Sequence, residues 1–226
     1  MKTFLLSALS AVLLGFSPLA ASATTVLGNA VLLSDLLNGG TLQVGDKRFD
    51  GFSYSATGDM PIANLVNVIP IQNDADGSFG IRIQGAFLDL ASSQGGSDAL
   101  IGFTVTAMDP ALEIVGVTIV GNPTQIGSAG AISVVETFDF DPNARLVIFD
   151  DENDINSVDA IQFAGLRKIQ ILKDISAIST TPGGMNTVTL SFVDQFFTQA
   201  GVVPEPASAV LMVLGLGLLA ARRRSS

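Results

Sequence analysis

Apolar and polar residues alternate along most of the chain between its two ends. Ile101, Phe103 and Val105 are separated by glycine and threonine, and a similar alternation recurs at Val115–Ile119 and at Val188–Phe192. Because successive side chains of a strand point to opposite faces of a sheet, a period of two predicts strands with one buried and one exposed face. Further strands are predicted at residues 41–44, 47–55, 63–70, 79–90, 131–140, 144–150, 157–164 and 166–173.

Turn-forming residues separate many of these segments. The clearest turn signals are Asn38-Gly39-Gly40, Asp74–Gly77, Gly95-Gly96, Asp109-Pro110, Gly121-Asn122-Pro123, Asp141-Pro142-Asn143 and Pro182-Gly183-Gly184. One short helix is predicted near Leu32–Leu37, ended by Asn38-Gly39. Many short strands with such turns and no long helical period predict an all-β fold, an antiparallel β-sandwich.

The first 23 residues have the pattern of a cleavable secretory signal peptide. Lys2 supplies a positive charge, the apolar run Phe4–Phe16 follows, and Pro18 ends it. Ala21 and Ala23 provide the small residues that signal peptidase requires, so cleavage is predicted after Ala23. The alternative, a first transmembrane helix, is disfavoured because the run is short.

Residues 204–226 form a second distinct segment. Pro204-Glu205-Pro206 comes first, the uncharged run Ala207–Ala221 follows, and Arg222, Arg223 and Arg224 lie at the end. The two prolines favour an extended backbone. Fifteen helical residues span about 23 Å, which is short for a membrane core of about 30 Å. The arginines are expected to stop transfer and remain in the cytoplasm.

This tail resembles the PEP-CTERM sorting signal of Gram-negative bacteria, with the PEP motif, a short membrane helix and an arginine cluster in order. The resemblance implies recognition by the membrane enzyme exosortase after transient residence in the inner membrane. It also implies a final place at the cell surface or in the extracellular matrix, often with exopolysaccharide. The alternative is an ordinary tail anchor.

The expected organisation is therefore a signal peptide at 1–23, a β-sandwich body at 24–199, a linker at 200–203 and the sorting signal at 204–226. The body has a weaker likeness to the β-rich bodies of PEP-CTERM proteins. The likeness rests on Gly45-Asp46-Lys47 with Phe49 and Phe52, on Lys173-Asp174-Ile175, and on Ser191-Phe192 with Gln195 and Phe196. The structural interpretation makes these four phenylalanines core residues and Gly45-Asp46 a turn.

Charge and composition exclude several functions. Without the two ends the chain keeps 20 acidic and 7 basic residues, a net charge of −13. This balance argues against nucleic acid and anionic membrane surfaces as partners. The chain has no cysteine and no histidine. Lipoprotein anchoring, zinc sites built from these residues, and Ser-His-Asp or Cys-His catalysis are thereby excluded.

One acidic region has partial metal-ligand spacing. Asp139, Asp141 and Asn143 alternate as at the start of a calcium loop, and Asp150 occupies its twelfth position. Ala144 replaces the glycine expected at the sixth position, and Asp150 is shorter than the usual glutamate. Solvated acidic loops are the simpler interpretation, and calcium is the one cofactor that the sequence admits.

The function predicted for the body is that of a non-enzymatic surface or matrix protein. The alternative is a secreted hydrolase that acts on polysaccharide through two carboxylates, since glycoside hydrolysis needs only a suitably spaced pair. No pair of acids stands out, and the absence of tryptophan leaves few aromatic platforms for sugars. A deep acidic cleft would favour the hydrolase, and convex sheets with short loops would favour the structural protein.

Overall fold

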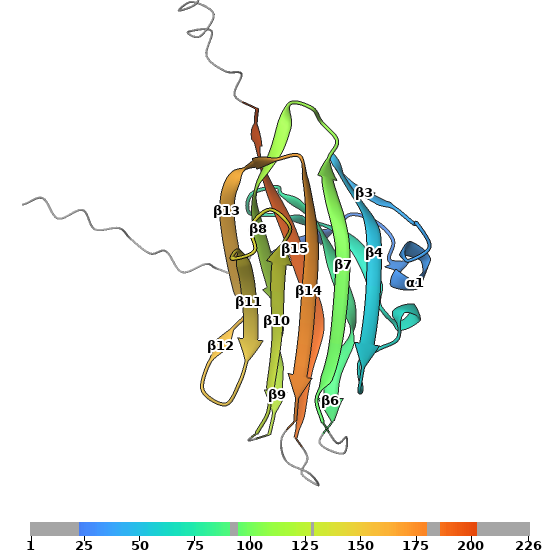
Figure 1. The fold of residues 1–226 in the computed structure, drawn as a ribbon, viewed down its shortest axis with the longest axis vertical. Coiled ribbons are helices and arrows are strands. Elements are labelled where there is room, and N and C mark those ends of the chain that lie inside the picture. Colours follow the sequence, from blue (N-terminus) through green and yellow to red (C-terminus); the bar gives the residue numbers. More distant parts are fainter. Residues whose placement is uncertain (1–22, 91–94, 128, 180–185, 203–226) are drawn as a thin grey trace, which may run out of the picture.

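The computed structural model describes residues 23–90, 95–127, 129–179 and 186–202. Within these residues fifteen strands form two antiparallel sheets that pack face to face, which confirms the predicted β-sandwich. In Figure 1, β10, β14, β7 and β4 run side by side across the molecule, and β15 lies behind them.

We call the two layers sheet A and sheet B. The order in sheet A is β1 (Thr24–Val26), β5 (Asn67–Asn73), β6 (Phe79–Leu90), β15 (Thr187–Gly201), β8 (Leu112–Gly121), β13 (Val158–Leu166), with β2 (Val31–Leu32) paired to β5 and β9 (Thr124–Ile126) paired to β15. The order in sheet B is β12 (Ile155–Asn156), β11 (Arg145–Asp150), β10 (Ala131–Phe138), β14 (Lys168–Ile178), β7 (Ser97–Ala107), β4 (Lys47–Thr57), β3 (Leu42–Val44).

Every long strand of the structure overlaps a predicted one, and β6 has the predicted bounds. The differences lie at the ends of strands and at short edges. Residues 63–65 form the 3₁₀ turn η1 (Ala63–Leu65), so β5 begins later than predicted. The strands β1, β2, β9 and β12 were not predicted, because two or three residues are too few to show a period.

The C-terminal boundary of the body was placed too early. Residues 200 and 201 were assigned to a linker, but β15 continues to Gly201, where Ala200 pairs with Glu113 and Gly201 with Leu112. The Val202 N–H then donates to the Ala111 carbonyl oxygen over 2.8 Å. Pairing with β8 holds this stretch in the sheet despite its small side chains.

The core lies between the sheets and is built by the alternation seen in the sequence. Ile101, Phe103 and Val105 of β7 are all buried. The ring of Phe49 in sheet B has its centroid 6.2 Å from that of Phe103 and 5.7 Å from that of Phe197 in sheet A. Aromatic contacts at these separations stabilise beyond the area that they bury, and here they join the two sheets.

Two irregularities decide where the predicted core phenylalanines lie. Gly51 has a φ of +64° at a register shift in β4, and this shift lets both Phe49 and Phe52 face the core. The pairing of β15 with β6 shifts between Leu190 and Phe192, after which Val193 is buried and Phe192 is only half-buried. The prediction of Phe192 as a core residue was therefore wrong, whereas Phe196 is buried but outside the main core cluster.

The predicted helix is present as α1 (Leu33–Leu36), which buries Leu33 and Leu36 against the sandwich. It ends as the glycines suggested, because Gly39 has a φ of +82° and the Gly40 N–H donates to the Leu36 carbonyl oxygen. Within the described ranges no helix has the length and apolar character needed to cross a membrane.

Candidate functional site

The structure describes the approach to the C-terminal tail and leaves out the tail itself. Pro204, Glu205 and Pro206, like Arg222, Arg223 and Arg224, lie outside the described residues. The last described residue, Val202, is still hydrogen-bonded to the β7–β8 connection. Only residue 203 therefore separates the folded body from the three-residue motif.

The same limit applies at the N-terminus. Ala21 lies outside the described residues, whereas Ala23 is exposed and directly precedes β1. The carbonyl oxygen of Ala23 accepts a hydrogen bond from the Asp74 N–H over 3.0 Å. Cleavage after Ala23 stays a prediction, and it would leave β1 as the first element of the mature chain.

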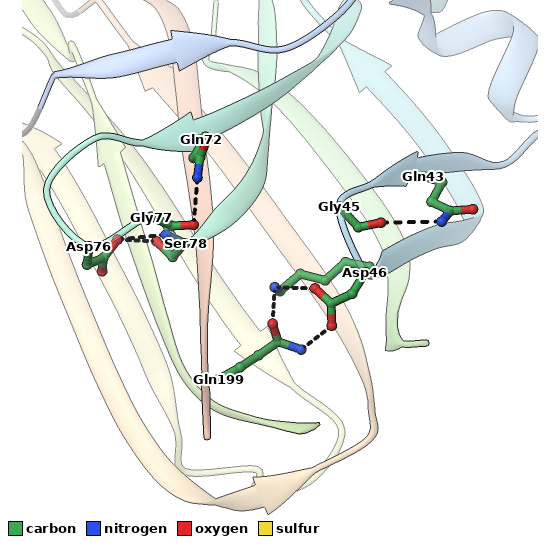
Figure 2. A network of polar contacts seen from close by, with 9 residues as sticks. Gln43, Gly45, Asp46, Gln72, Asp76, Gly77, Ser78 and Gln199 are labelled. Atoms are coloured by element: carbon green, nitrogen blue, oxygen red, sulfur yellow. Dashed lines mark hydrogen bonds and ion pairs between the residues drawn. The ribbon is translucent and has the colours of Figure 1, made fainter. Parts of the chain in front are cut away.

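A polar clamp holds the end of β15 to the opposite sheet, as Figure 2 shows. Gln199 donates from Nε2 to Asp46 Oδ2 over 2.6 Å, and its Oε1 accepts from Lys47 Nζ over 2.6 Å. Lys47 also pairs with Asp46 Oδ1 at 3.2 Å, and its ammonium group lies 5.4 Å from the ring centroid of Phe79. We call Asp46, Lys47 and Gln199 the end clamp.

The end clamp encloses a lysine that is almost fully buried, with 1% of its surface exposed. Burial lowers the pKa of Lys47, and the charge and hydrogen bond of Asp46 oppose this effect. A cavity of about 180 Å³ lies beside it, bordered by Ser78, Phe79 and Gln199 among others. This space is large enough for a few water molecules.

A second lysine, carboxyl and glutamine set lies deep between the sheets. Glu136 of β10 and Lys173 of β14 are paired residues on the inner face of sheet B, and Gln195 projects from β15 in sheet A. Lys173 donates from Nζ to Glu136 Oε2, and Gln195 donates from Nε2 to Glu136 Oε1 over 2.5 Å. All three residues are completely buried. We call Glu136, Lys173 and Gln195 the core triad.

The electrostatics of the core triad are dominated by burial. Burial raises the pKa of Glu136, and the charge and hydrogen bond of Lys173 and the hydrogen bond of Gln195 oppose the rise. Gln195 Oε1 is buried and has no hydrogen-bond partner in the described part of the chain. Buried ion pairs are weak evidence for stability, because apolar residues of similar volume often serve as well. The core triad therefore needs an explanation beyond packing.

The outer side of sheet A carries a separate ion pair. Arg82 of β6 donates to the two carboxylate oxygens of Asp194 at 2.6 and 2.8 Å, and Thr24 Oγ1 of β1 is 3.4 Å from Asp194 Oδ2. The guanidinium of Arg82 also lies 4.3 Å from the ring centroid of Phe192. The register shift in β15 that places Phe192 outside the core thus sets its half-buried ring under an arginine.

Two acids meet on the outer side of sheet B. Burial, followed by the neighbouring carboxyl group of Asp98, raises the pKa of Asp174. Retaining and inverting glycosidases hold their carboxyl groups about 5 Å or more apart so that the sugar or a water fits between them.

A shallow hollow of about 320 Å³ also lies on this side of sheet B. Ser53, Thr137, Asp139 and Gln170 are among the residues that line it, and neither Asp98 nor Asp174 is. The hollow depends on Gly102, because a Cβ there would come within 2.4 Å of Ser53 Oγ. It therefore offers hydroxyl and amide groups and a single carboxylate, that of Asp139.

The candidate calcium ligands are dispersed. Asp139 Oδ1 accepts from the Gln170 N–H, Asp141 Oδ1 from the Asn143 N–H, and Asp150 Oδ2 from the Gln125 N–H, each over 2.9 Å. Asp141 precedes β11 (Arg145–Asp150), and Asp150 is the last residue of that strand. A strand of this length spans roughly 20 Å, so it keeps the two carboxylates apart. Within the described ranges no group of three or more metal-ligating side chains is assembled.

The comparison with family models resolves the segment that follows β15. Residues 202–225 match the model of the PEP-CTERM protein-sorting motif. The chain carries a PEP-CTERM sorting signal. The match starts one residue after β15 ends, and it confirms the resemblance seen in the sequence. A PEP-CTERM motif implies export to the cell envelope or surface and processing by exosortase.

Other comparisons add little to the PEP-CTERM match. No curated protein matches the chain. One similar solved structure is that of TmCBM61 in complex with β-1,4-galactotriose, with 12% identity, coverage of 64% of this chain and 88% of that one, and a TM-score of 0.28. Another is the enzymatically active domain of tailspike protein 4 from bacteriophage CBA120, with 12% identity, coverage of 67% and 19%, and a TM-score of 0.26. Scores this low support no argument about function.

Sequence reasoning did not identify the core triad as a site. The alternation of buried positions did point to these residues. Lys173 falls on the same face of its strand as the buried Ile171 and Ile175, and Glu136 on the same face as the buried Ile132 and Val134. A charged residue at an inward position of an alternating strand indicates a buried partner on the facing sheet. Sequence alone could not indicate that Gln195 was this partner.

Proposed function

We propose that this chain is a non-enzymatic protein of the cell surface or extracellular matrix, delivered by its PEP-CTERM signal after signal peptidase and exosortase act on its two ends. The observation that carries the proposal is the join between body and signal. β15 pairs with β6 over residues 187–197 and with β8 over residues 193–201, its end is held by the end clamp, and the sorting motif follows at once.

This join gives the body a mechanical role in sorting. A strand with neighbours on both sides cannot be drawn out of the sheet without breaking both ladders of hydrogen bonds. The folded sandwich therefore stays intact while the tail is held at the membrane. With one residue between Val202 and Pro204, the processing enzyme meets its motif directly against the end of the sandwich.

The surfaces of the body support display in preference to catalysis. Asp98 and Asp174, the two neighbouring acids on the outer side of sheet B, do not line the hollow of that sheet. That hollow presents hydroxyl and amide groups, which suit hydrogen bonding to a hydrated polymer. We propose exopolysaccharide of the matrix as the material with which the mature body associates. The alternative, a polysaccharide hydrolase, would require a second carboxylate beside the hollow.

Replacement of Pro204, Glu205 and Pro206 by alanine tests the sorting proposal. The variant is expected to accumulate in the inner membrane with its body in the periplasm, because alanines favour helix where the prolines forbid it and the recognition motif is lost. Ser208→Ala is the control, because it changes the tail outside the motif and should leave surface delivery unchanged. Fractionation and immunoblotting report the location.

Mass spectrometry of the surface protein completes this test. The expected mature protein begins at Thr24 and lacks peptides between Leu211 and Arg222. Persistence of those peptides in correctly located protein would show that the tail is a permanent anchor and would contradict processing. For the enzymatic alternative, the purified protein is incubated with matrix polysaccharide. Release of reducing ends that Asp174→Asn abolishes would contradict the non-enzymatic role.

A further inference from the structure

The core triad holds an amine and an amide against one carboxyl group. Lys173 Nζ is hydrogen-bonded to one oxygen of Glu136, and Gln195 Nε2 is hydrogen-bonded to the other. Lys173 belongs to sheet B and Gln195 to sheet A. We propose that Lys173 and Gln195 form an intramolecular amide cross-link between the two sheets, with Glu136 as the catalytic acid and base.

The surroundings favour this chemistry. An amine reacts as a nucleophile only when neutral, so the lysine must first give a proton to the carboxylate beside it. The raised pKa of Glu136 favours this transfer, because the carboxyl group accepts the lysine proton more readily. All three side chains are fully buried, so the reacting groups are held together and bulk water is excluded.

The reaction needs no co-reactant. Glu136 Oε2 takes a proton from the Lys173 ammonium, which leaves a neutral amine and a neutral carboxyl group. The amine lone pair attacks Cδ of Gln195 and forms the new C–N bond. The protonated Glu136 carboxyl group then gives its proton to Nε2 and takes a second proton from Nζ. The Cδ–Nε2 bond breaks and ammonia leaves. An ammonium, a carboxylate and a primary amide thus become a secondary amide, ammonia and a neutral carboxyl group, with atoms and charge conserved.

The unpartnered oxygen of Gln195 is a second observation on the same group. A buried carbonyl oxygen without a donor is a cost that folded proteins rarely accept. Gln195 is hydrogen-bonded through its leaving nitrogen, and Lys173 binds the other oxygen of the same carboxyl group. The lack of a donor at the Gln195 oxygen also predicts a slow reaction, because no hydrogen bond stabilises the developing negative charge. A slow reaction suffices for a bond that forms once in each molecule.

The end clamp provides an internal comparison with the same three residue types. There the oxygen of Gln199 already accepts a hydrogen bond from Lys47, and the Asp46 side chain is 23% exposed. The side-chain carbonyl of Gln199 is thus engaged as an acceptor, and the carboxylate of Asp46 is in contact with solvent. We therefore expect no cross-link between Lys47 and Gln199.

The cross-link would serve a chain that has no cysteine. It would join β14 to β15, the strand that leads into the sorting tail, and close a loop between residues 173 and 195. Like a disulfide, such a bond limits the freedom of the unfolded chain. Unlike a disulfide, it does not depend on the redox state of the surroundings. The inference does not depend on the proposed function.

Peptide mapping of the mature protein from the cell surface tests the cross-link. Cleavage on the N-terminal side of aspartates separates the peptide that ends at Lys173 from the peptide that begins at Asp194. We expect these two peptides to remain joined, with a combined mass lower than their sum by one ammonia. Loss of one water and attachment to Glu136 would overturn the assignment to Gln195. Two separate, unmodified peptides after prolonged incubation of the folded protein would overturn the proposal.

Two variants control for other sources of ammonia loss. Lys173→Arg keeps the positive charge beside Glu136 but removes the attacking amine, and Glu136→Gln keeps the shape but removes the proton carrier. Both are expected to yield separate peptides, and either result suffices if the other variant does not fold. Joined peptides in both folded variants would contradict the mechanism. Lys47→Arg, at the end clamp, is expected to leave the cross-link intact.

Discussion

Gln199 Nε2 donates to Asp46 Oδ2 over 2.6 Å and so connects the last strand of the fold to the β3–β4 turn of the opposite sheet. Gln199→Ala removes this bond and also the acceptor of Lys47, a buried ammonium. We expect the free energy of unfolding to fall by about 1–3 kcal/mol, the usual cost of a buried polar group that loses its partner. Urea unfolding measures the change.

The neighbouring Thr198 is an exposed residue of the same strand, and Thr198→Ala is the matched control. Its effect should stay within about 0.5 kcal/mol, as for most surface substitutions. Equal effects of the two substitutions would show that the end clamp does not stabilise the fold.

The fold was largely predictable, because alternation is a local property of the sequence. Each of the long strands has enough residues to show the period of two, and Gly39 and Gly40 marked the end of α1. Phe192 was misplaced because a register shift in β15 depends on the pairing partner, which the strand sequence does not reveal.

The candidate sites were less predictable than the fold. The sorting motif is contiguous and could be recognised from its order alone. The core triad combines residues 136, 173 and 195 from three strands, and only the topology of both sheets brings them together. The possible calcium ligands were close together in sequence, but part of that segment forms β11. An extended strand keeps apart residues that a calcium-binding loop would bring together around the metal.

Arg82→Ala is expected to be one of the most damaging surface substitutions. The Asp194 side chain is 3% exposed, so loss of the guanidinium leaves a buried carboxylate uncompensated. Breaking a buried pair in this way costs about 3–5 kcal/mol. The loss of stability in Arg82→Lys should be smaller than in Arg82→Ala but still measurable, because lysine loses one of the two hydrogen bonds to Asp194 and the contact with Phe192. Arg48→Ala removes an exposed pair with Asp50 and should cost less than about 1 kcal/mol. Similar losses for Arg82 and Arg48 would contradict the difference in burial.

Asp174→Asn is expected to stabilise the protein at pH 7. The raised pKa of Asp174 means that the folded state binds this proton more tightly than the unfolded state does. Its contribution to stability is therefore present below about pH 3.8, the ordinary value, and is lost as pH rises through the folded pKa. Asparagine is neutral at every pH, so the gain at pH 7 should be a few tenths to about 1 kcal/mol after screening by solvent.

Thermal unfolding at several pH values checks this prediction. The difference between Asp174→Asn and the unchanged protein should shrink toward pH 3 and should also shrink at high salt, because salt screens the repulsion from Asp98. Asp98→Asn should act in the same direction. A variant that is less stable than the unchanged protein at pH 7 would show that the charged form of Asp174 is favoured.

Calcium removal is expected to leave stability unchanged. Asp139, Asp141 and Asp150 each accept a hydrogen bond from a backbone N–H, and they do not converge on one point. A metal that binds only the folded state would add about 2.7 kcal/mol at one hundred times its dissociation constant. The melting temperature is measured with chelator and with added calcium. A fall of several degrees, reversed by calcium and absent in Asp141→Ala, would establish a calcium site.

Tyr54 is the one tyrosine of the chain, and no tryptophan is present, so its ionisation can be followed directly by ultraviolet absorbance. Burial raises the pKa of Tyr54 to about 12, and its hydroxyl donates to the Pro61 carbonyl oxygen over 2.5 Å. The folded state holds this proton more tightly than the unfolded state, whose pKa is about 10. The contribution of Tyr54 to stability is thus complete below pH 10 and is lost as pH rises toward 12. Tyr54→Phe should lower the free energy of unfolding by about 0.5–1.5 kcal/mol at neutral pH and should remove this alkaline loss. A titration midpoint near 10 in the folded protein would show that the hydroxyl is solvated and unbound.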